Sequence, residues 1–327
     1  MKIAIVRLSA LGDIFQSMII LQFIKSKYPT AQIDWVVDSF YEDALKGNSD
    51  INNIITVNLK KLKKSFSFRE LFNIIKRLKS LSTYDYIIDL QGLLKSAVIS
   101  SFIPGKSRFG YDKISIREKF AALFYSKTFS IPYDENVIKR YVGILNYALD
   151  LEITSKEIFS KKPIFNYPKN DNPTTKKGLI IIGASFESKI YPVEYFARVV
   201  NSLDLDFIVV WKTAKEKQMA TELVKLTNKS NLSDGLDLSA LKNLVANASI
   251  VIGGDTGPTH LAWAMNIPSI TLFGPTPMER NFFQTSINHG IKSKSNVNPY
   301  KINKNDDSIR NINPAEISHL ASKILKI

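Results

Sequence analysis

Residues 249–276 read SIVIGGDTGPTHLAWAMNIPSITLFGPT and contain one complete strand–turn–helix–strand unit. Residues 249–253 form a short β-branched run, the pattern of a buried parallel strand. After the turn, Pro258 suits the first position of a helix, and residues 259–265 continue that helix. Residues 267–273 are a second buried strand. This unit is the repeating element of an open α/β sheet.

The turn Gly-Gly-Asp-Thr-Gly-Pro lies at the carboxyl end of its strand, where open α/β sheets bind ligands. Glycines permit a tight turn and close approach of a ligand. The first N–H groups of the helix, near Thr256 and Gly257, suit a phosphate or diphosphate. Turns of this kind also occur without a ligand, and the glycines alone do not separate the two interpretations. Asp255 and His260, both polar, favour a binding site.

The length of 327 residues suits two domains, each able to bury a core. The absence of cysteine excludes disulfides and thiolate metal sites, which fits a reducing cytoplasm. The opening run MKIAIVRLSALGD is interrupted by Arg7, so we expect no signal peptide. No run reaches the roughly 18 apolar residues of a membrane span.

The net charge of +14 favours anionic partners, which are phosphorylated substrates, anionic lipid surfaces or nucleic acid. Scattered lysines also fit a lysine-rich genome, whereas the cluster at Lys60, Lys61, Lys63 and Lys64 fits it less well. The basic clusters lack the interleaved aromatic residues that stack nucleic-acid bases, so we expect no nucleic-acid partner.

Strands and helices alternate along both halves of the chain. In the first half we expect strands at 2–8, 33–37, 51–57 and 84–90, and helices at 14–27, 68–81, 94–101, 116–124 and 137–149. In the second half we expect strands at 179–182 and 207–211 and helices at 193–203, 215–226 and 239–246. The alternation predicts α/β domains with parallel sheets covered on both faces.

The polar segment 161–177 divides the two series. We expect a first Rossmann-like domain over residues 1–160, a linker over 161–177 and a second Rossmann-like domain over 178–313. The part of the second domain at 285–313 is polar and expected to be irregular. A closing helix is expected within 314–327. The two sheets are expected to face each other across a cleft.

Three polar positions follow predicted strands. Asp13, next to Gly12, is either a helix N-cap, which the local sequence favours, or a carboxylate base in a partly desolvated site where its pKa would rise. Lys189, in the same loop as Ser185, suits neutralisation of a leaving diphosphate, although most loop lysines are simply solvated. Glu216 suits ribose hydroxyls or, alternatively, is a charge in the first turn of a helix.

Two apparent metal motifs are set aside. The D-x-D spacing at Asp204 and Asp206 lies before its strand, at the edge away from the ligand. His260, His289 and His319 are too scattered to form a metal site. No metal is expected.

Four motifs, in this order, resemble those of the ADP-heptose:lipopolysaccharide heptosyltransferases of glycosyltransferase family 9. They are RLSALGDI at 7–14, DLQGLLKS at 89–96, KIYP at 189–192 and DTGPTHL at 255–261. The DWVV run at 34–37 and Arg117-Glu118 are similar to heptosyltransferase I, which adds the first heptose to Kdo-lipid A. The resemblance covers nearly the whole chain.

The resemblance implies a GT-B fold and an inverting, metal-independent transfer of heptose from ADP-L-glycero-D-manno-heptose to Kdo of Kdo-lipid A, with no cofactor. It assigns Asp13 as general base and Lys189 as the lysine on the diphosphate. Its donor-site residues are Ser185, Lys189, Glu216, Leu236, Asp255, Thr256, Gly257 and His260. Its acceptor-site residues are Gly12, Lys60, Lys61, Lys63, Lys64, Gln91 and Arg117. It implies a cytoplasmic enzyme in peripheral contact with the anionic inner membrane.

The chain departs from the family pattern at three positions. Arg7 and Ala10 replace the commoner Lys and Ser, and Lys212 stands where glycine is usual. Lysines in place of arginines at 60–64 remove bidentate phosphate recognition. Two other activities stay open, a sister transferase such as heptosyltransferase II or another nucleotide-sugar transferase, and a sugar-nucleotide epimerase with two similar domains.

Overall fold

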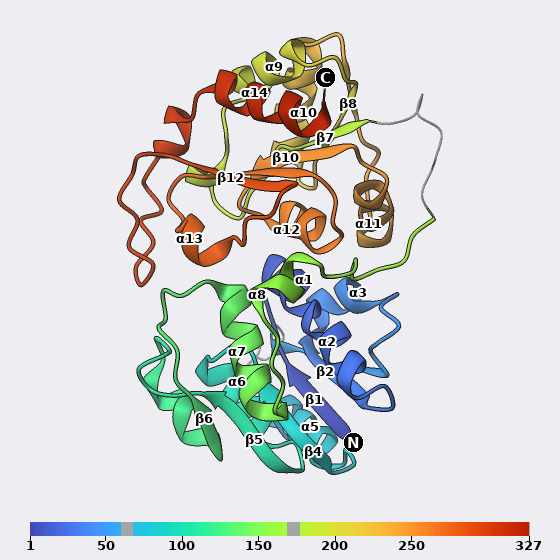
Figure 1. The fold of residues 1–327 in the computed structure, drawn as a ribbon, viewed down its shortest axis with the longest axis vertical. Coiled ribbons are helices and arrows are strands. Elements are labelled where there is room, and N and C mark those ends of the chain that lie inside the picture. The colour runs from blue at the N-terminus through green and yellow to red at the C-terminus, as the bar shows by residue number, and fades with distance from the viewer. Residues whose placement is uncertain (60–67, 169–176, 327) are drawn as a thin grey trace. The chain divides into compact units, whose positions relative to one another are not determined.

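The computed structural model describes residues 1–59, 68–168 and 177–326. The chain forms two units, Met1–Phe165 and Asn166–Ile327, which divide inside the segment expected to be a linker. Each unit contains one parallel sheet of six strands (Figure 1). Among the described residues, no helix is long and apolar enough to cross a membrane.

The sheet of unit 1 has the strand order β3-β2-β1-β4-β5-β6. Its strands are β1 (Lys2–Val6), β2 (Gln32–Asp38), β3 (Asn53–Val57), β4 (Tyr84–Asp89), β5 (Gly105–Tyr111) and β6 (Lys127–Phe129). Its helices are α1 (Leu11–Met18), α2 (Ile20–Lys27), α3 (Glu42–Leu45), α5 (Phe68–Lys79), α6 (Leu94–Ser101), α7 (Val137–Leu149) and α8 (Ser155–Phe159), with 3₁₀ helices η1 (Ser39–Tyr41) and η2 (Lys119–Phe124).

Both faces of this sheet are covered. Val6, Val36 and Ile87 from three neighbouring strands pack on one face with Leu78 of α5 and Ile99 of α6. Successive side chains of a strand point to opposite faces, and the alternate residues of β1 and β2 are equally buried. Helices α1 and α2 both contact α7. Burial on both faces explains why these strands are mainly apolar in the sequence.

The sheet of unit 2 has the order β12-β11-β10-β7-β8-β9. Its strands are β7 (Gly178–Ile181), β8 (Phe207–Val210), β9 (Ser230–Leu232), β10 (Ile250–Gly254), β11 (Ser269–Phe273) and β12 (Asn288–Lys292). Its helices are α9 (Val193–Ser202), α10 (Ala214–Lys225), α11 (Leu238–Ala246), α12 (Gly257–Ala264), α13 (Met278–Asn281) and α14 (Pro314–Leu325), with 3₁₀ helices η4 (Glu187–Lys189) and η5 (Ser308–Asn311). Helices α9, α10 and α14 cover one face, and α11 and α12 the other (Figure 1).

Local chemistry fixes several helix starts. Asp237 accepts a hydrogen bond from the backbone N–H of Ala240 at the start of α11. Asn313 does the same for Ala315 at the start of α14, where Pro314 occupies the first turn. Side-chain acceptors at this position satisfy N–H groups that the helix itself leaves unpaired.

Three predictions are wrong in detail. The segment 14–27 is not one helix, because α1 begins already at Leu11 and ends at Met18, and α2 begins at Ile20. The segment 116–124 contains the 3₁₀ helix η2 rather than an α-helix. The tail 285–313 is not irregular throughout, since β12 pairs with β11 from Asn288 to Lys292. Strands β5, β6, β9 and β12 carry too many polar residues for an apolar pattern to reveal them.

Candidate active site

In each sheet the strand order reverses beside the first strand of the unit, and this is where open α/β sheets bind ligands. In unit 1 the first strand, β1, lies between β2 and β4, and in unit 2 the first strand, β7, lies between β8 and β10. Asp13 and Gln91 follow β1 and β4. Lys189 and Asp255 follow β7 and β10. Each unit therefore places predicted site residues at its own switch point.

Two buried side chains of unit 2, Lys189 and His260, meet at the Asp255 carboxylate. Oδ2 lies 3.0 Å from Nζ of Lys189, and Oδ1 lies 2.8 Å from Nε2 of His260. The Lys189 and His260 side chains are only 9% and 7% exposed. The amide of Asn281 lies 3.4 Å from Oδ2. The interpretation of Lys189 as a solvated loop lysine is therefore wrong.

Lys189 and His260 keep the Asp255 carboxylate ionised. Burial raises the pKa of Asp255, but the charge of Lys189 and the hydrogen bond and charge of His260 outweigh it and hold this pKa well below its usual range. Since a carboxylate only accepts hydrogen bonds, the Nε2 atom of His260 carries a proton. The other ring nitrogen, Nδ1, is buried and has no hydrogen-bond partner among the described residues. Buried polar atoms are normally paired, so this nitrogen indicates a place for a polar ligand atom.

The first turn of α12 lies directly after this cluster. The N–H of Thr256 donates to Oγ1 of Thr259 at 3.3 Å, and that hydroxyl lies 2.9 Å from the carbonyl oxygen of Gly254. The helix begins at Gly257, with Pro258 in its first turn. Thr256 and Gly257 are part-exposed, while Thr259 and the residues after it are buried. A part-exposed helix N-terminus beside a lysine is suited to an anionic group.

The two glycines before this turn have a different role from the one expected. A Cβ on Gly253 would lie 2.7 Å from Cβ of Ile181, and a Cβ on Gly254 would lie 2.9 Å from the carbonyl oxygen of Lys189. Both glycines belong to β10. They make room for the neighbouring β7 and its loop. The predicted ligand contact therefore rests on Thr256 and Gly257 in the turn itself, and it stays a prediction.

Glu216 combines a structural contact with a position near this edge. Its carboxylate accepts the backbone N–H groups of Lys212 at 2.7 Å and Thr213 at 3.2 Å, while Thr213 Oγ1 accepts the N–H of Glu216. This is a capping box at the start of α10, as the helix-charge alternative predicts. A Cβ on Gly183 would lie 2.3 Å from its carboxylate carbon. Glu216 thus lies against the loop after β7.

Ser185 and Leu236 complete the predicted donor residues. Ser185 is exposed in the loop after β7, and Leu236 is half-buried in the loop after β9. All the predicted donor residues therefore follow β7, β8, β9 or β10, at the carboxyl edge of one sheet.

Asp13 in unit 1 is paired with a buried cation. Oδ2 of Asp13 lies 2.7 Å from a guanidinium nitrogen of Arg7, whose side chain is 8% exposed against 37% for Asp13. Arg7 also donates to the carbonyl oxygen of Leu90 at 3.2 Å and lies over the ring of Tyr141 at 5.5 Å. Burial lowers the pKa of Arg7, but the charge and hydrogen bond of Asp13, together with Tyr141 and Tyr111, outweigh burial and raise this pKa above its ordinary value. The ion pair thus keeps the buried Arg7 charged.

The N-cap interpretation of Asp13 is wrong in position. Helix α1 begins at Leu11 and its N-cap is Ala10, so Asp13 is the third helical residue. Its Oδ2 accepts the backbone N–H of Ala10 at 3.2 Å, which is the N3 half of a capping box. Among the described residues, Oδ1 has no hydrogen-bond partner. The carboxylate therefore has one oxygen engaged by the protein and one open to a substrate.

Gln91 joins the two loops at the switch point of unit 1. Its Oε1 accepts the backbone N–H of Leu8 at 2.8 Å, and its Nε2 lies 3.3 Å from Oγ of Ser9. Nζ of Lys95 lies 2.9 Å from the same hydroxyl. Burial lowers the pKa of Lys95, although the nearby charge of Asp38 raises it. Gln91 thus fixes the loop that precedes α1, the helix that carries Asp13.

The other predicted acceptor residues have fewer contacts than Gln91 with the residues around them. Gly12 lies in the first turn of α1. Arg117 follows β5 and is exposed, with its guanidinium 5.6 Å from the centre of the Tyr133 ring. Lys60, Lys61, Lys63 and Lys64 lie outside the described residues, so their predicted contacts stay predictions.

Sequence reasoning missed several partners of these residues. Arg7 stood out only as a departure from the family pattern, and Lys95 only as part of a motif. Asn281 lies 26 residues beyond Asp255 and belongs to no motif. Only the folded chain brings this amide to the carboxylate.

Comparisons with known proteins agree with this geometry. The family model described as glycosyltransferase family 9 (heptosyltransferase) matches residues 71–308. Lipopolysaccharide heptosyltransferase 1 of Campylobacter coli is 36% identical, with 99% of each chain covered. Its Escherichia coli counterpart is 23% identical over 84% of this chain and 88% of its own.

Solved structures support the same fold. The structure of E. coli heptosyltransferase WaaC with ADP superposes with a TM-score of 0.82 at 19% identity, covering 99% of this chain and 100% of that one. The E. coli ADP-heptose heptosyltransferase II structure has a TM-score of 0.69 at 18% identity, covering 100% of this chain and 99% of that one. The two six-stranded parallel sheets match the GT-B architecture of these enzymes. The chain therefore belongs to glycosyltransferase family 9, the heptosyltransferases.

Proposed function

We propose that this enzyme transfers heptose from ADP-heptose to the Kdo of Kdo-lipid A, as a lipopolysaccharide heptosyltransferase of type I. Relatives named lipopolysaccharide heptosyltransferase 1 support the type, since the C. coli protein is 36% identical and the heptosyltransferase 2 of Haemophilus ducreyi is 26% identical. The donor class is supported by WaaC, which was solved with ADP and with ADP-2-deoxy-2-fluoro heptose.

The observation that carries the donor site is the buried Lys189–Asp255–His260 cluster at the start of α12. Asp255 holds the Lys189 ammonium at 3.0 Å in a site with little solvent. An ammonium has three N–H donors, so Lys189 can contact Asp255 and a phosphate oxygen together. Lys189 and the N–H groups of α12 would stabilise the charge on departing ADP.

The chemistry we assign is a single displacement. The Kdo hydroxyl oxygen attacks the anomeric carbon of heptose, and the bond from that carbon to the diphosphate oxygen breaks. Asp13 takes the hydroxyl proton on Oδ1, because Oδ2 is engaged by Arg7 and by the N–H of Ala10. The configuration at the anomeric carbon inverts. The assigned residues need no metal, since Lys189 supplies the cation.

The acceptor contacts are assigned to unit 1. Gln91 holds the loop before α1, the helix of Asp13, and Arg117 is exposed at the same edge of the sheet. The lysines at 60, 61, 63 and 64 are proposed to meet acceptor phosphates as solvated point charges, because lysine lacks the planar fork of arginine. The enzyme would work at the cytoplasmic face of the inner membrane, where its lipid acceptor is held.

Purified enzyme with ADP-heptose and Kdo-lipid A tests the proposal. We expect ADP release in step with a lipid product heavier by one heptose. A type II enzyme would instead require an acceptor that already carries heptose. Competition with other ADP- and UDP-linked sugars identifies the donor. ADP release without lipid acceptor, or no turnover of either lipid, would contradict heptose transfer.

A further inference from the structure

Two large apolar side chains of η2 are exposed. Phe120 is 74% exposed and Leu123 is 80% exposed, while Ala121 between them is fully buried. A 3₁₀ helix has three residues per turn, so residues three apart lie on the same side. Phe120 and Leu123 therefore project together from one side of η2, and Ala121 anchors the opposite side.

A third apolar side chain extends this surface. Leu94, the first residue of α6, is 42% exposed, and its backbone N–H donates to Oε2 of Glu118 at 2.6 Å. Helix α6 packs against η2. We call Leu94, Phe120 and Leu123 the η2 face. Clustered exposed side chains of this size are typical of an interaction surface rather than of an ordinary protein surface.

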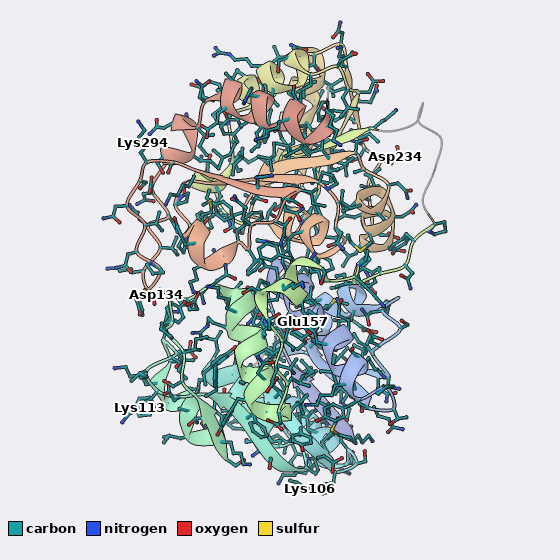
Figure 2. The ribbon with its side chains drawn as sticks, in the orientation of Figure 1. Lys106, Lys113, Asp134, Glu157, Asp234 and Lys294 are labelled. Carbon is teal, nitrogen blue, oxygen red and sulfur yellow. The ribbon has the colours of Figure 1, made fainter. Side chains whose placement is uncertain are left out.

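The charges around the η2 face are mainly positive. Lys113, Arg117 and Lys119 are all exposed in the segment that leads into η2, and Lys113 extends outward from unit 1 (Figure 2). The acidic residues in the same segment are occupied, since Glu118 accepts from Leu94 and Asp112 accepts from Ser115. An apolar patch bordered by cations complements an anionic lipid surface.

The position of this segment agrees with a lipid partner. It leaves β5 at the carboxyl edge of the sheet, the edge that also carries Asp13. Arg117, a proposed acceptor contact, lies three residues before Phe120. A lipid acceptor stays anchored by its acyl chains, so the enzyme surface next to the acceptor residues must approach the bilayer.

We propose that the η2 face inserts Phe120 and Leu123 into an anionic bilayer, with Lys113 and Lys119 against the lipid phosphates. The part of this inference that turns the η2 face toward the membrane rests on the proposed function. Apolar insertion supplies salt-resistant binding, and the lysines supply a salt-sensitive part.

Sedimentation with vesicles tests the proposal. The full-length protein is mixed with vesicles of phosphatidylethanolamine and phosphatidylglycerol, or of phosphatidylcholine alone. We expect wild type to bind the anionic vesicles, and Phe120→Ser/Leu123→Ser to lower the partition coefficient at least about tenfold, because two apolar side chains no longer insert. The matched control Phe159→Ser/Leu226→Ser removes a Phe and a Leu that are also exposed, at 56% and 46%, and should bind like wild type.

A conservative variant keeps the test independent of folding. Phe120→Trp should retain binding, and its added fluorescence should shift to the blue and be quenched by brominated lipid. If Phe120→Ser/Leu123→Ser binds vesicles like wild type, or if the tryptophan stays in water, the proposal is wrong. It is equally wrong if light scattering shows that these side chains instead hold two copies of the chain together.

Turnover separates this inference from the proposed function. Phe120→Ser/Leu123→Ser should act normally on acceptor dispersed in detergent and lose activity on acceptor embedded in vesicles. An equal loss on both forms would contradict a membrane role. If wild type turns over neither form yet binds vesicles through Phe120, the proposed reaction fails and the membrane surface stands.

Discussion

The carboxylate of Asp13 has two partners with different requirements. The N–H of Ala10 needs an acceptor, whereas the buried guanidinium of Arg7 needs a negative charge. Asparagine keeps the acceptor and removes the charge. This one substitution therefore separates the capping contact from the ion pair and the proposed proton transfer.

We expect Asp13→Asn to lower kcat at least about a hundredfold, because an amide cannot take the acceptor proton. Asp13 is more than a third exposed, so the lost ion pair should lower the unfolding free energy by only about 1 kcal/mol. Steady-state kinetics at a temperature where the variant is fully folded, together with urea unfolding, measures both effects. ADP affinity should not change. Near-normal turnover would refute Asp13 as the base.

A second residue, Asp255, tests the buried cluster. Asp255→Asn leaves the Lys189 ammonium buried without its counter-charge, which should lower the unfolding free energy by about 3 kcal/mol and weaken ADP binding. The control Asp204→Asn removes a carboxylate whose side chain is 98% exposed and should change neither. Unchanged stability of Asp255→Asn in urea unfolding would show that the pair contributes nothing.

The same residue predicts a pH effect. The pKa of Asp255 is lower in the folded protein than in the unfolded chain. Its contribution to stability is therefore fully present above the unfolded value of about 3.9 and is lost as pH falls toward the folded value. Wild type should lose this contribution in acid, and the loss should be absent in Asp255→Asn.

At the scale of elements, the sequence was most informative where strands are buried on both faces. Strands β1, β7, β10 and β11 are mainly apolar runs, and β4 is apolar or aromatic except at Asp85 and Asp89; each was expected within a few residues. Strands β5 and β12 were missed because GKSRFGY and NHGIK combine glycine with charged or polar residues. They are recognised only through their parallel partners, β4 and β11.

In the candidate site, the position of each residue at a strand end was predictable, as the apolar strands were. Residues after strand ends were located from the apolar patterns, because the carboxyl ends of parallel strands share an edge. The partner of each residue was not predictable. Arg7 reaches Asp13 across the turn between β1 and α1, and Asn281 reaches Asp255 from a distant helix.

ADP should order α12 and the loop after β7 more than any element of unit 1. We expect hydrogen exchange with ADP present to slow in residues 178–280, with the strongest protection around Thr256 and His260. The reason is that the first turn of α12 and Lys189 supply the phosphate contacts. Protection centred on Gly12, or equal in both units, would contradict the donor assignment.

For the whole molecule, the net charge of +14 makes stability depend on pH through general repulsion as well as through single groups. Protonating any carboxylate adds to the positive charge, so a fall in stability on acidification does not by itself identify a residue. A single group is identified only by comparison with a variant that changes the net charge equally.

Lys161 offers such a comparison on the alkaline side. Its side chain is buried, and burial lowers its pKa to about 7, against about 10.4 in an unfolded chain. Between these values the unfolded state binds more protons than the folded state, so stability should rise with pH from about 7 to about 10.

Lys161→Met removes the titrating group and should abolish this rise. At pH 7 it should raise the unfolding free energy by a few kcal/mol, up to about 4. Lys162→Met, at the exposed neighbouring position, makes the same change in net charge and should leave the rise intact. Urea unfolding of the three proteins at pH 7 and pH 9.5 decides the matter, and parallel pH profiles for all three would show that Lys161 is charged in the folded protein.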